Sequence, residues 1–174
     1  MIDLQYPIGK FARPTEFSEA AVTQWQEEIR HAPMRLRTLV KGITPEQLEA
    51  RYREGGWSIK TVVHHLADMH MNAFLRCKLA LAEENPTVMV VPEQAFALQA
   101  DATGGIEDSL MIIDGVHARW SQLFQSIARE RWDRGFIHPA SGRVLSLHTT
   151  LAMYAWHSAH HCAHIQQALT HPVN

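Results

Sequence analysis

Helix start and stop signals divide this chain so regularly that they constrain its fold more than any single motif does. Ser58 can accept a hydrogen bond at the start of one helix, Pro86 ends that helix, and Pro33 can occupy the first turn of another. The periodic segments between such signals predict four long helices, at about 15–31, 58–85, 106–129 and 146–170, and shorter helices at 33–42 and from 44 onward. Four long helices in 174 residues predict an all-α four-helix bundle.

Two of the connections between these helices are too long for tight turns. Residues 86–104 hold Pro86, Pro92 and Gly104, with one helical turn predicted around 93–99, so this segment predicts a long crossover connection. Residues 135–147 predict a small hairpin-like excursion before the last helix, with its turn at 139–142. We expect a single domain over residues 1–174, because a chain of this length buries roughly two thirds of its unfolded surface in one core.

Composition argues against several classes of protein. A net charge of −2 gives no electrostatic reason to expect a nucleic-acid partner. The N-terminus lacks a basic stretch followed by an apolar run, and no segment reaches about 18 uninterrupted apolar residues, so we expect neither export nor a membrane-spanning segment. Cys77 and Cys162 lack CxxC spacing, which predicts neither a disulfide framework nor a thiolate zinc site, and a reducing cytoplasm is therefore the expected location.

The densest group of histidines lies at residues 156–164, inside the last predicted helix. His157 and His161 are four residues apart, as are His160 and His164, and residues four apart share one face of a helix. Two imidazoles placed this way can share one divalent metal ion, as an HxxxH segment does in zinc metalloproteases. Serine and alanine stand where the glutamate base of that motif would be, so the run predicts a metal site without naming a reaction.

The apolar stripe of the last helix distinguishes the two histidine pairs. His161 falls at the edge of this stripe with His157 one turn before it, whereas His160 lies well off the stripe and His164 slightly farther round. His148 falls on the outer face. The stripe consists of Leu147, Leu151, Tyr154, Cys162, Ile165 and Leu169. Periodicity therefore favours His157 and His161 as the inward pair and leaves the other two with supporting or surface roles; the alternative is that both pairs are partly exposed surface histidines.

A third ligand can come from the helix that begins at Ser58. His65 lies on the flank of its apolar stripe, His70 lies within the stripe, and His64 projects to the opposite face. Spacing alone leaves His65 and His70 equally placed as the third ligand, and a hydrogen-bonded core imidazole is the alternative for His70. His117 lies in the middle of the apolar stripe of the helix predicted at 106–129. This position favours structural burial over a role as a hydrogen-bond partner of a metal ligand or as a contact to substrate.

Several short segments, in order along nearly the whole chain, carry a resemblance to a known family. They are Tyr6–Gly9, Tyr52–Trp57, Val62–Asp68, His70–Asn72, Arg119–Trp120, Arg134–Phe136, His138–Pro139, Trp156–Ser158, His160–His161 and Ala163–Ile165. With these segments the chain resembles the DinB/YfiT-like superfamily, and specifically the YfiT branch of metal-dependent hydrolases that are related to bacillithiol S-transferases. So many matches in order are more specific than a lone HxxxH motif.

The resemblance implies a DinB-like four-helix bundle in which three histidines bind one divalent ion per chain. Matched residue by residue, these ligands are His65, His157 and His161, in agreement with the pair that periodicity favours. The ion is implied to be Zn²⁺ or Ni²⁺, because imidazole suits both metals. Members of the family often form homodimers, so the resemblance also carries the expectation of a homodimer.

Three neutral nitrogen ligands leave an ion an open position, which is typical of a catalytic site. The expected function is that of a hydrolase that uses metal-activated water on a small-molecule substrate. The alternative is S-transfer from bacillithiol or another low-molecular-weight thiol to an electrophile, and a further alternative is a non-catalytic metal-binding stress protein. Arg76 and Arg119 are candidate substrate-binding residues, and the catalytic residues stay unassigned.

Overall fold

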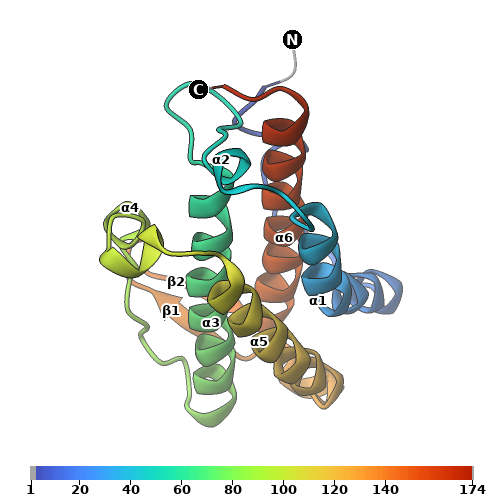
Figure 1. The fold of residues 1–174 in the computed structure, drawn as a ribbon. Helices are drawn as coiled ribbons and strands as arrows, with labels where there is room; N and C mark the ends of the chain where they lie inside the picture. Colours follow the sequence, from blue (N-terminus) through green and yellow to red (C-terminus); the bar gives the residue numbers. More distant parts are fainter. Residues whose placement is uncertain (1–2, 174) are drawn as a thin grey trace.

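Four long helices make up most of the computed structural model, which describes residues 3–173 (Figure 1). They are α1 (Glu19–Leu39), α3 (Ile59–Ala82), α5 (Glu107–Gln125) and α6 (Leu147–Thr170). The shorter elements are α2 (Pro45–Leu48), α4 (Glu93–Phe96), the 3-10 turns η1 (Ala100–Thr103) and η2 (Arg129–Arg131), and the strands β1 (Gly135–His138) and β2 (Arg143–Ser146). The predicted all-α four-helix bundle is confirmed.

The long connection between α3 and α5 runs back along the bundle. Helices α1 and α3 each pack against both α5 and α6. His64 Nδ1 lies 2.7 Å from Ser109 Oγ, and one to two turns farther along both helices His70 Nδ1 lies 2.7 Å from His117 Nε2, so α3 and α5 are parallel neighbours. Because parallel neighbours cannot be joined by a tight turn, residues 83–106 must return the length of the bundle, as Figure 1 shows. The predicted crossover connection is confirmed, and α4 and η1 lie on it.

Hydroxyl caps fix where the long helices begin. Ser58 Oγ accepts a hydrogen bond from the Thr61 N–H at 3.2 Å, as the sequence predicted, and Ser146 caps α6 in the same way. Helix α1 begins after the cap Ser18 rather than near residue 15. Helix α5 ends at Gln125, earlier than predicted, because the chain then passes into a separate 3-10 turn.

Pro33 lies inside α1, so the prediction of two separate helices at 15–31 and 33–42 is wrong. A proline inside a helix has no N–H to donate to the carbonyl four residues earlier, which here belongs to Ile29. The Ile29 side chain is fully buried, and the Nδ1–H of His117 on α5 donates to the Ile29 carbonyl at 2.6 Å. Tertiary packing thus replaces the hydrogen bond that proline removes, and α1 continues without a break.

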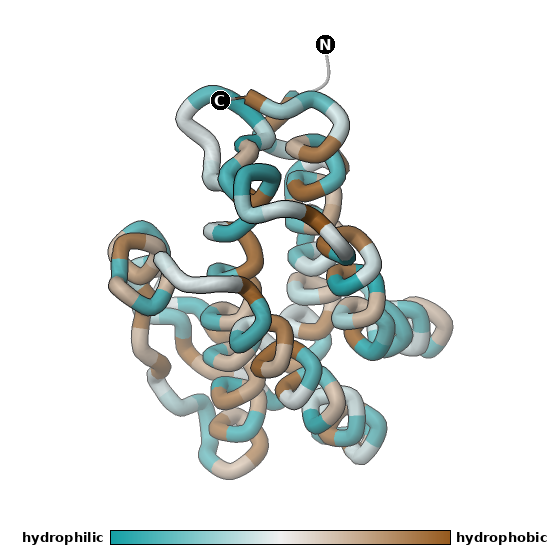
Figure 2. Tube along the Cα trace, viewed as in Figure 1, coloured by the Kyte–Doolittle hydropathy of each residue, from teal (hydrophilic) through white to brown (hydrophobic). Residues whose placement is uncertain are grey.

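A polar layer divides the hydrophobic core into two clusters, and Figure 2 shows apolar residues alternating with polar ones along each long helix. One cluster includes Leu36 of α1, Val62 and Leu66 of α3, Leu110 and Ile113 of α5, and Ile165 of α6. The other includes Ile29 of α1, Phe74 and Cys77 of α3, Trp120 and Phe124 of α5, and Leu151 of α6. Along their helices, His70, His117 and His157 lie between the residues of the two clusters. The core is therefore interrupted at mid-height by imidazoles.

A two-stranded hairpin precedes α6, as predicted for residues 135–147. Strands β1 and β2 are antiparallel, with Gly135 paired to Ser146. Gly135 has no room for a Cβ because the Leu145 carbonyl approaches it too closely. The Ile137 N–H donates to the Pro86 carbonyl at 2.9 Å, so the hairpin anchors the start of the crossover connection.

Within residues 3–173, no helix combines the length and the apolar composition that crossing a membrane requires.

The link between Pro33 and His117 predicts a coupling between the two side chains. Replacing His117→Phe leaves the Ile29 carbonyl without a donor and should lower the free energy of unfolding by about 1–3 kcal/mol. In a Pro33→Ala background residue 33 regains an N–H that can donate to this carbonyl, so the same replacement should cost less. Urea unfolding of the four proteins gives the coupling energy directly. The hydrogen bond between His117 and His70 is lost in both backgrounds, so it cancels from the comparison. Equal costs of His117→Phe with proline and with alanine at position 33 would therefore contradict the coupling.

Candidate metal centre

Three histidines from two helices converge at one side of the polar layer. His65 comes from α3, and His157 and His161 come from adjacent turns of α6. One ring nitrogen from each lies within 4.8 Å of the others, and Nε2 of His65 lies 3.3 Å from Nε2 of His157. The four-residue spacing places the α6 pair on one face, and the neighbouring helix α3 brings His65 to that face.

The arrangement of these nitrogens fits a divalent ion. Two imidazole ligands bound at the usual zinc distance with a tetrahedral angle between them lie about 3.3–3.4 Å apart, which is the separation of the two Nε2 atoms. Neutral imidazole also suits nickel. His65 and His161 are buried, at 6% and 7% exposure, while His157 is partly exposed. The trio can therefore hold an ion that a small molecule still reaches.

The protonation states of the trio favour metal binding. Burial, and to a smaller extent the positive charges that His160 and His164 would carry, lower the pKa of His65 to about 4. Burial, followed by the neighbouring histidines, also places the pKa values of His157 and His161 well below the ordinary range. All three rings are neutral at pH 7, so each keeps a lone pair for an ion.

His70 and His117 lie behind the trio rather than in it. Nε2 of His70 is 2.9 Å from Nδ1 of His157, and Nδ1 of His70 is 2.7 Å from Nε2 of His117. Spacing left His65 and His70 equally placed, and the structure brings only His65 into the converging group. His117 is 1% exposed, in keeping with the burial that its stripe predicted.

Three histidines expected on outer or surface faces are buried instead. His64 was predicted to project away from the apolar stripe, but α5 covers it and Ser109 bonds its ring at 2.7 Å. The Tyr6 ring, from the segment before α1, stacks against His160 with ring centroids 5.8 Å apart, and the Tyr52 ring stacks against His164 with centroids 3.8 Å apart. The outward position predicted for His64 is wrong, and of the supporting or surface roles predicted for His160 and His164 the surface alternative is excluded. A neighbouring helix and loops cover faces that helical periodicity alone leaves open.

His148 also differs from its predicted outer position. Its ring is stacked against Phe17 at 4.5 Å and against Trp132 at 5.1 Å, so it is largely covered. The covering aromatic residues come from the segment before α1 and from the turn after η2. Neither segment shows helical periodicity, so the sequence pattern of α6 contained no sign of them.

The two predicted substrate-binding arginines lie in different surroundings. The Arg76 guanidinium donates to the Met89 carbonyl on the crossover connection and lies over the Phe136 ring. Arg76 also lines a cavity of about 370 Å³ together with Tyr154, whose ring centroid is 5.5 Å from that of His157. Arg119 is exposed on α5 and lies over the Phe74 ring at 5.3 Å. The substrate roles of both residues stay predictions, and only Arg76 borders a cavity near the trio.

A second cavity, of about 220 Å³, borders the trio directly. Its lining includes His161, Trp57 and Arg53, together with Gln94 from α4. The Trp57 ring lies 4.6 Å from the His65 ring. In the sequence, Trp57 was named only at the end of the segment Tyr52–Trp57 that carries the family resemblance, and Gln94 lay within the predicted long connection. The signal that could have pointed to this lining is the matching segment Tyr52–Trp57, most of whose residues border the cavity.

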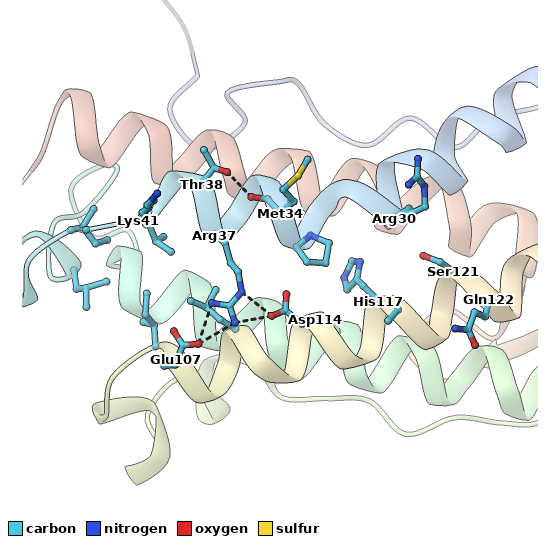
Figure 3. A pocket seen from close by; sticks show the side chains of 18 of the residues that line it. Arg30, Met34, Arg37, Thr38, Lys41, Glu107, Asp114, His117, Ser121 and Gln122 are labelled. Carbon is cyan, nitrogen blue, oxygen red and sulfur yellow. Dashed lines mark hydrogen bonds and ion pairs between the residues drawn. The ribbon is translucent and has the colours of Figure 1, made fainter.

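A larger groove lies apart from the trio, between α1 and α5 (Figure 3). Its volume is about 1040 Å³, and none of the three converging histidines lines it. Arg37 bridges it by donating to Asp114 at 2.8 Å and to Glu107 at 3.1 Å. His117 borders this groove between the two helices, so the polar layer extends from the trio to the α1–α5 face.

A sequence model of the DinB superfamily matches residues 19–165. The chain belongs to the DinB superfamily. This DinB-superfamily protein is 42% identical, over 95% of either chain, to a Bacillus licheniformis protein named "Putative metal-dependent hydrolase". It is 44% identical to a Geobacillus kaustophilus protein with the same description, over 93% of this chain and 92% of the relative.

The solved structure of YfiT from Bacillus subtilis is similar to that of this DinB-superfamily protein. The two superpose with a TM-score of 0.92 at 36% sequence identity, over 96% of either chain. YfiT is described as "a probable metal-dependent hydrolase with an unusual four-helix bundle topology". The match supports the fold and the family, and the resemblance to YfiT is confirmed.

The buried histidines predict that the metal-free protein loses stability in mild acid. Burial lowers the pKa of His117 from 6.5 to about 4, so between these values the unfolded chain binds a proton that the folded protein does not. The stabilisation is therefore fully present above pH 6.5 and is lost as the pH falls toward 4. At about pH 5 this residue alone should cost about 2 kcal/mol of the free energy of unfolding.

Urea unfolding in the presence of a chelator, at about pH 7.5 and about pH 5, measures this loss. The His117→Phe variant is the matched control, because it lacks the titrating ring and should lose about 2 kcal/mol less between the two conditions. An unfolding free energy that is the same at both pH values in the unsubstituted protein would show that these rings are not buried neutral.

Proposed function

We propose that this protein is a divalent-metal-dependent enzyme in which His65, His157 and His161 bind one Zn²⁺ or Ni²⁺ per chain. The observation that carries the proposal is the convergence of three neutral ring nitrogens within 4.8 Å, in a group that has no fourth member among the described residues. Three protein ligands leave an ion an open position, as in catalytic rather than structural zinc sites.

Hydrolysis of a small-molecule substrate is the function that we favour, because the similar proteins from Bacillus and Geobacillus are named as metal-dependent hydrolases. A divalent ion bound at such a site would either lower the pKa of a water toward about 7, for attack on an ester or amide, or deprotonate a thiol. The chain itself supplies neutral ligands, and the partial exposure of His157 gives a substrate access from solvent.

The cavity beside the trio supports one alternative, S-transfer from a low-molecular-weight thiol to an electrophile. None of the residues that line this cavity carries a carboxylate, so a general base there would have to be a histidine such as His160 or His164 rather than an Asp or Glu. A thiol that loses its proton on meeting an ion needs no such base. Arg53 lines the same cavity and provides a positive charge for an anionic group of a thiol.

The proposed ligand set predicts the effect of single substitutions on metal content. His65→Gln, His157→Gln and His161→Gln should each reduce bound zinc or nickel to well below one ion per chain, because each removes one of three ligands. Elemental analysis of protein purified without a nickel column measures the metal content. Absence of stoichiometric metal from the unsubstituted protein, even after incubation with either ion, would contradict the proposal.

His160→Gln provides the matched control for these variants. His160 is buried on the same helix next to His161, but it is not one of the converging group, so its replacement should leave the metal content near that of the unsubstituted protein. An equal loss of metal from His160→Gln would show that the wrong histidine pair of α6 has been assigned to the ion.

The two candidate reactions predict different products from the metal-loaded protein. Cleavage of members of an ester and amide panel, abolished by a chelator and restored by zinc or nickel, would support the hydrolase. Conjugation of monochlorobimane by a panel of low-molecular-weight thiols without hydrolysis would support the transferase instead. Full metal occupancy with neither reaction would contradict both and leave a metal-binding protein without catalysis.

A further inference from the structure

A continuous chain of hydrogen bonds joins the proposed metal ligand His157 to a backbone carbonyl on the far side of the bundle. His157 Nδ1 lies 2.9 Å from His70 Nε2, and His70 Nδ1 lies 2.7 Å from His117 Nε2. His117 Nδ1 then lies 2.6 Å from the carbonyl oxygen of Ile29. This series of hydrogen bonds passes from α6 through α3 and α5 to α1, so it connects all four long helices.

The Ile29 carbonyl fixes the direction of every hydrogen bond in this series. A carbonyl oxygen can only accept, so the Nδ1 of His117 carries the proton and its Nε2 carries a lone pair. A neutral imidazole has one N–H and one lone pair, so His70 must donate from Nδ1 to His117 and accept at Nε2. By the same argument His157 donates from Nδ1 to His70. Its remaining nitrogen, Nε2, then carries a lone pair, and this is the atom that lies 3.3 Å from Nε2 of His65.

We propose that His70 and His117 are positioning residues that hold His157 as its Nδ1–H tautomer and so present its Nε2 lone pair to the metal ion. The inference rests on the proposed metal site, since these hydrogen bonds can orient a metal ligand only if His157 is one. The relay consists of His157, His70, His117 and the Ile29 carbonyl. Histidine ligands in other metal sites commonly donate their second N–H to a carboxylate or carbonyl, and here two imidazoles stand between the ligand and that carbonyl.

The Ile29 carbonyl is free to accept from His117 because residue 33 is a proline. In an ordinary helix the Ile29 carbonyl would already accept from the N–H of residue 33, but proline has none. The buried carbonyl therefore offers its full acceptor strength to His117, which lies between α1 and α5 at the groove seen in Figure 3. A feature that looks like a helix breaker thus sets the direction of hydrogen bonds that reach the opposite helices.

Burial makes the alternative direction costly. His70 and His117 are 2% and 1% exposed and lie between two apolar clusters, where an unpaired N–H or lone pair finds no water. If His70 and His157 reversed their tautomers, Nδ1 of His70 and Nε2 of His117 would both present lone pairs to each other. Two facing acceptors without a proton between them cost the free energy of two unmet polar groups. The geometry therefore permits one assignment of protons.

The direct test is the tautomeric state of the three rings in the metal-free protein. Long-range ¹H–¹⁵N correlation spectra of ¹⁵N-histidine-labelled protein distinguish an Nδ1–H ring from an Nε2–H ring at each position. We expect the Nδ1–H form at His117, His70 and His157, at neutral pH and with a chelator present. An Nε2–H form at His70 or His157 would overturn the relay, whether or not the protein binds metal.

Substitutions behind the ligand test the consequence for the ion. His70→Phe should weaken zinc binding about 10–100-fold, the usual effect of losing a partner of a metal ligand. His117→Phe should weaken it less, and it should convert part of the His157 population to the Nε2–H form, because His70 is then free to reverse. A purely structural role for His117 would leave the His157 tautomer unchanged, and that result would overturn the proposal. Competition with a chromophoric chelator measures the affinities.

His64→Phe is the matched control for these two variants. His64 is also a buried histidine of α3 with one hydrogen-bond partner on α5, but it has no bond to the relay. Its replacement should leave the His157 tautomer and the zinc affinity unchanged, and a loss equal to that of His70→Phe would overturn the relay in favour of general packing damage. Correct tautomers in a protein that binds no zinc would instead refute the proposed metal function.

Discussion

A buried neutral imidazole carries one N–H and one lone pair, and leaving either without a partner costs roughly 1–3 kcal/mol. This constraint governs the middle of the bundle, where His70, His117 and His157 lie between two apolar clusters. Each ring can form a hydrogen bond with its neighbour only if the four helices keep one register along their axes. The imidazole layer thus adds a directional requirement to the packing of the two apolar clusters, because hydrogen bonds depend on distance and angle.

The site divides its tasks between rigid and irregular parts of the chain. The converging histidines stand on α3 and α6, whose backbones are held by helical hydrogen bonds and core packing. The cavity that borders the three histidines is lined largely by loop residues, such as Tyr6, Arg53 and Gly56. Helices hold ligands in place more precisely than loops do, whereas loops accept changes in shape at little cost. In the proposed enzyme, metal binding and substrate recognition would therefore depend on different segments.

Sequence patterns predicted those features that arise within a single segment. Ser58 and Ser146 cap helices because a hydroxyl satisfies an N–H only two or three residues away. The convergence of His157 with His161 follows from helical spacing in the same way. The patterns were wrong at Pro33, His64 and His148, where the deciding contact comes from another helix or loop. A helical wheel shows which face a residue occupies, but it does not show what covers that face.

The sequence by itself determined the four helices, the hairpin, the crossover connection and the α6 histidine pair, because local hydrogen bonding and periodicity specify them. Its resemblance to the DinB superfamily added His65 as the third expected ligand. Only the tertiary structure showed that His65 converges with His157 and His161, while His70 lies behind them. Only the tertiary structure also showed that the Ile29 carbonyl directs the hydrogen bonds of His117, His70 and His157. The physical reason is that the proton on a buried imidazole is placed by its partners, and here each partner belongs to a different helix.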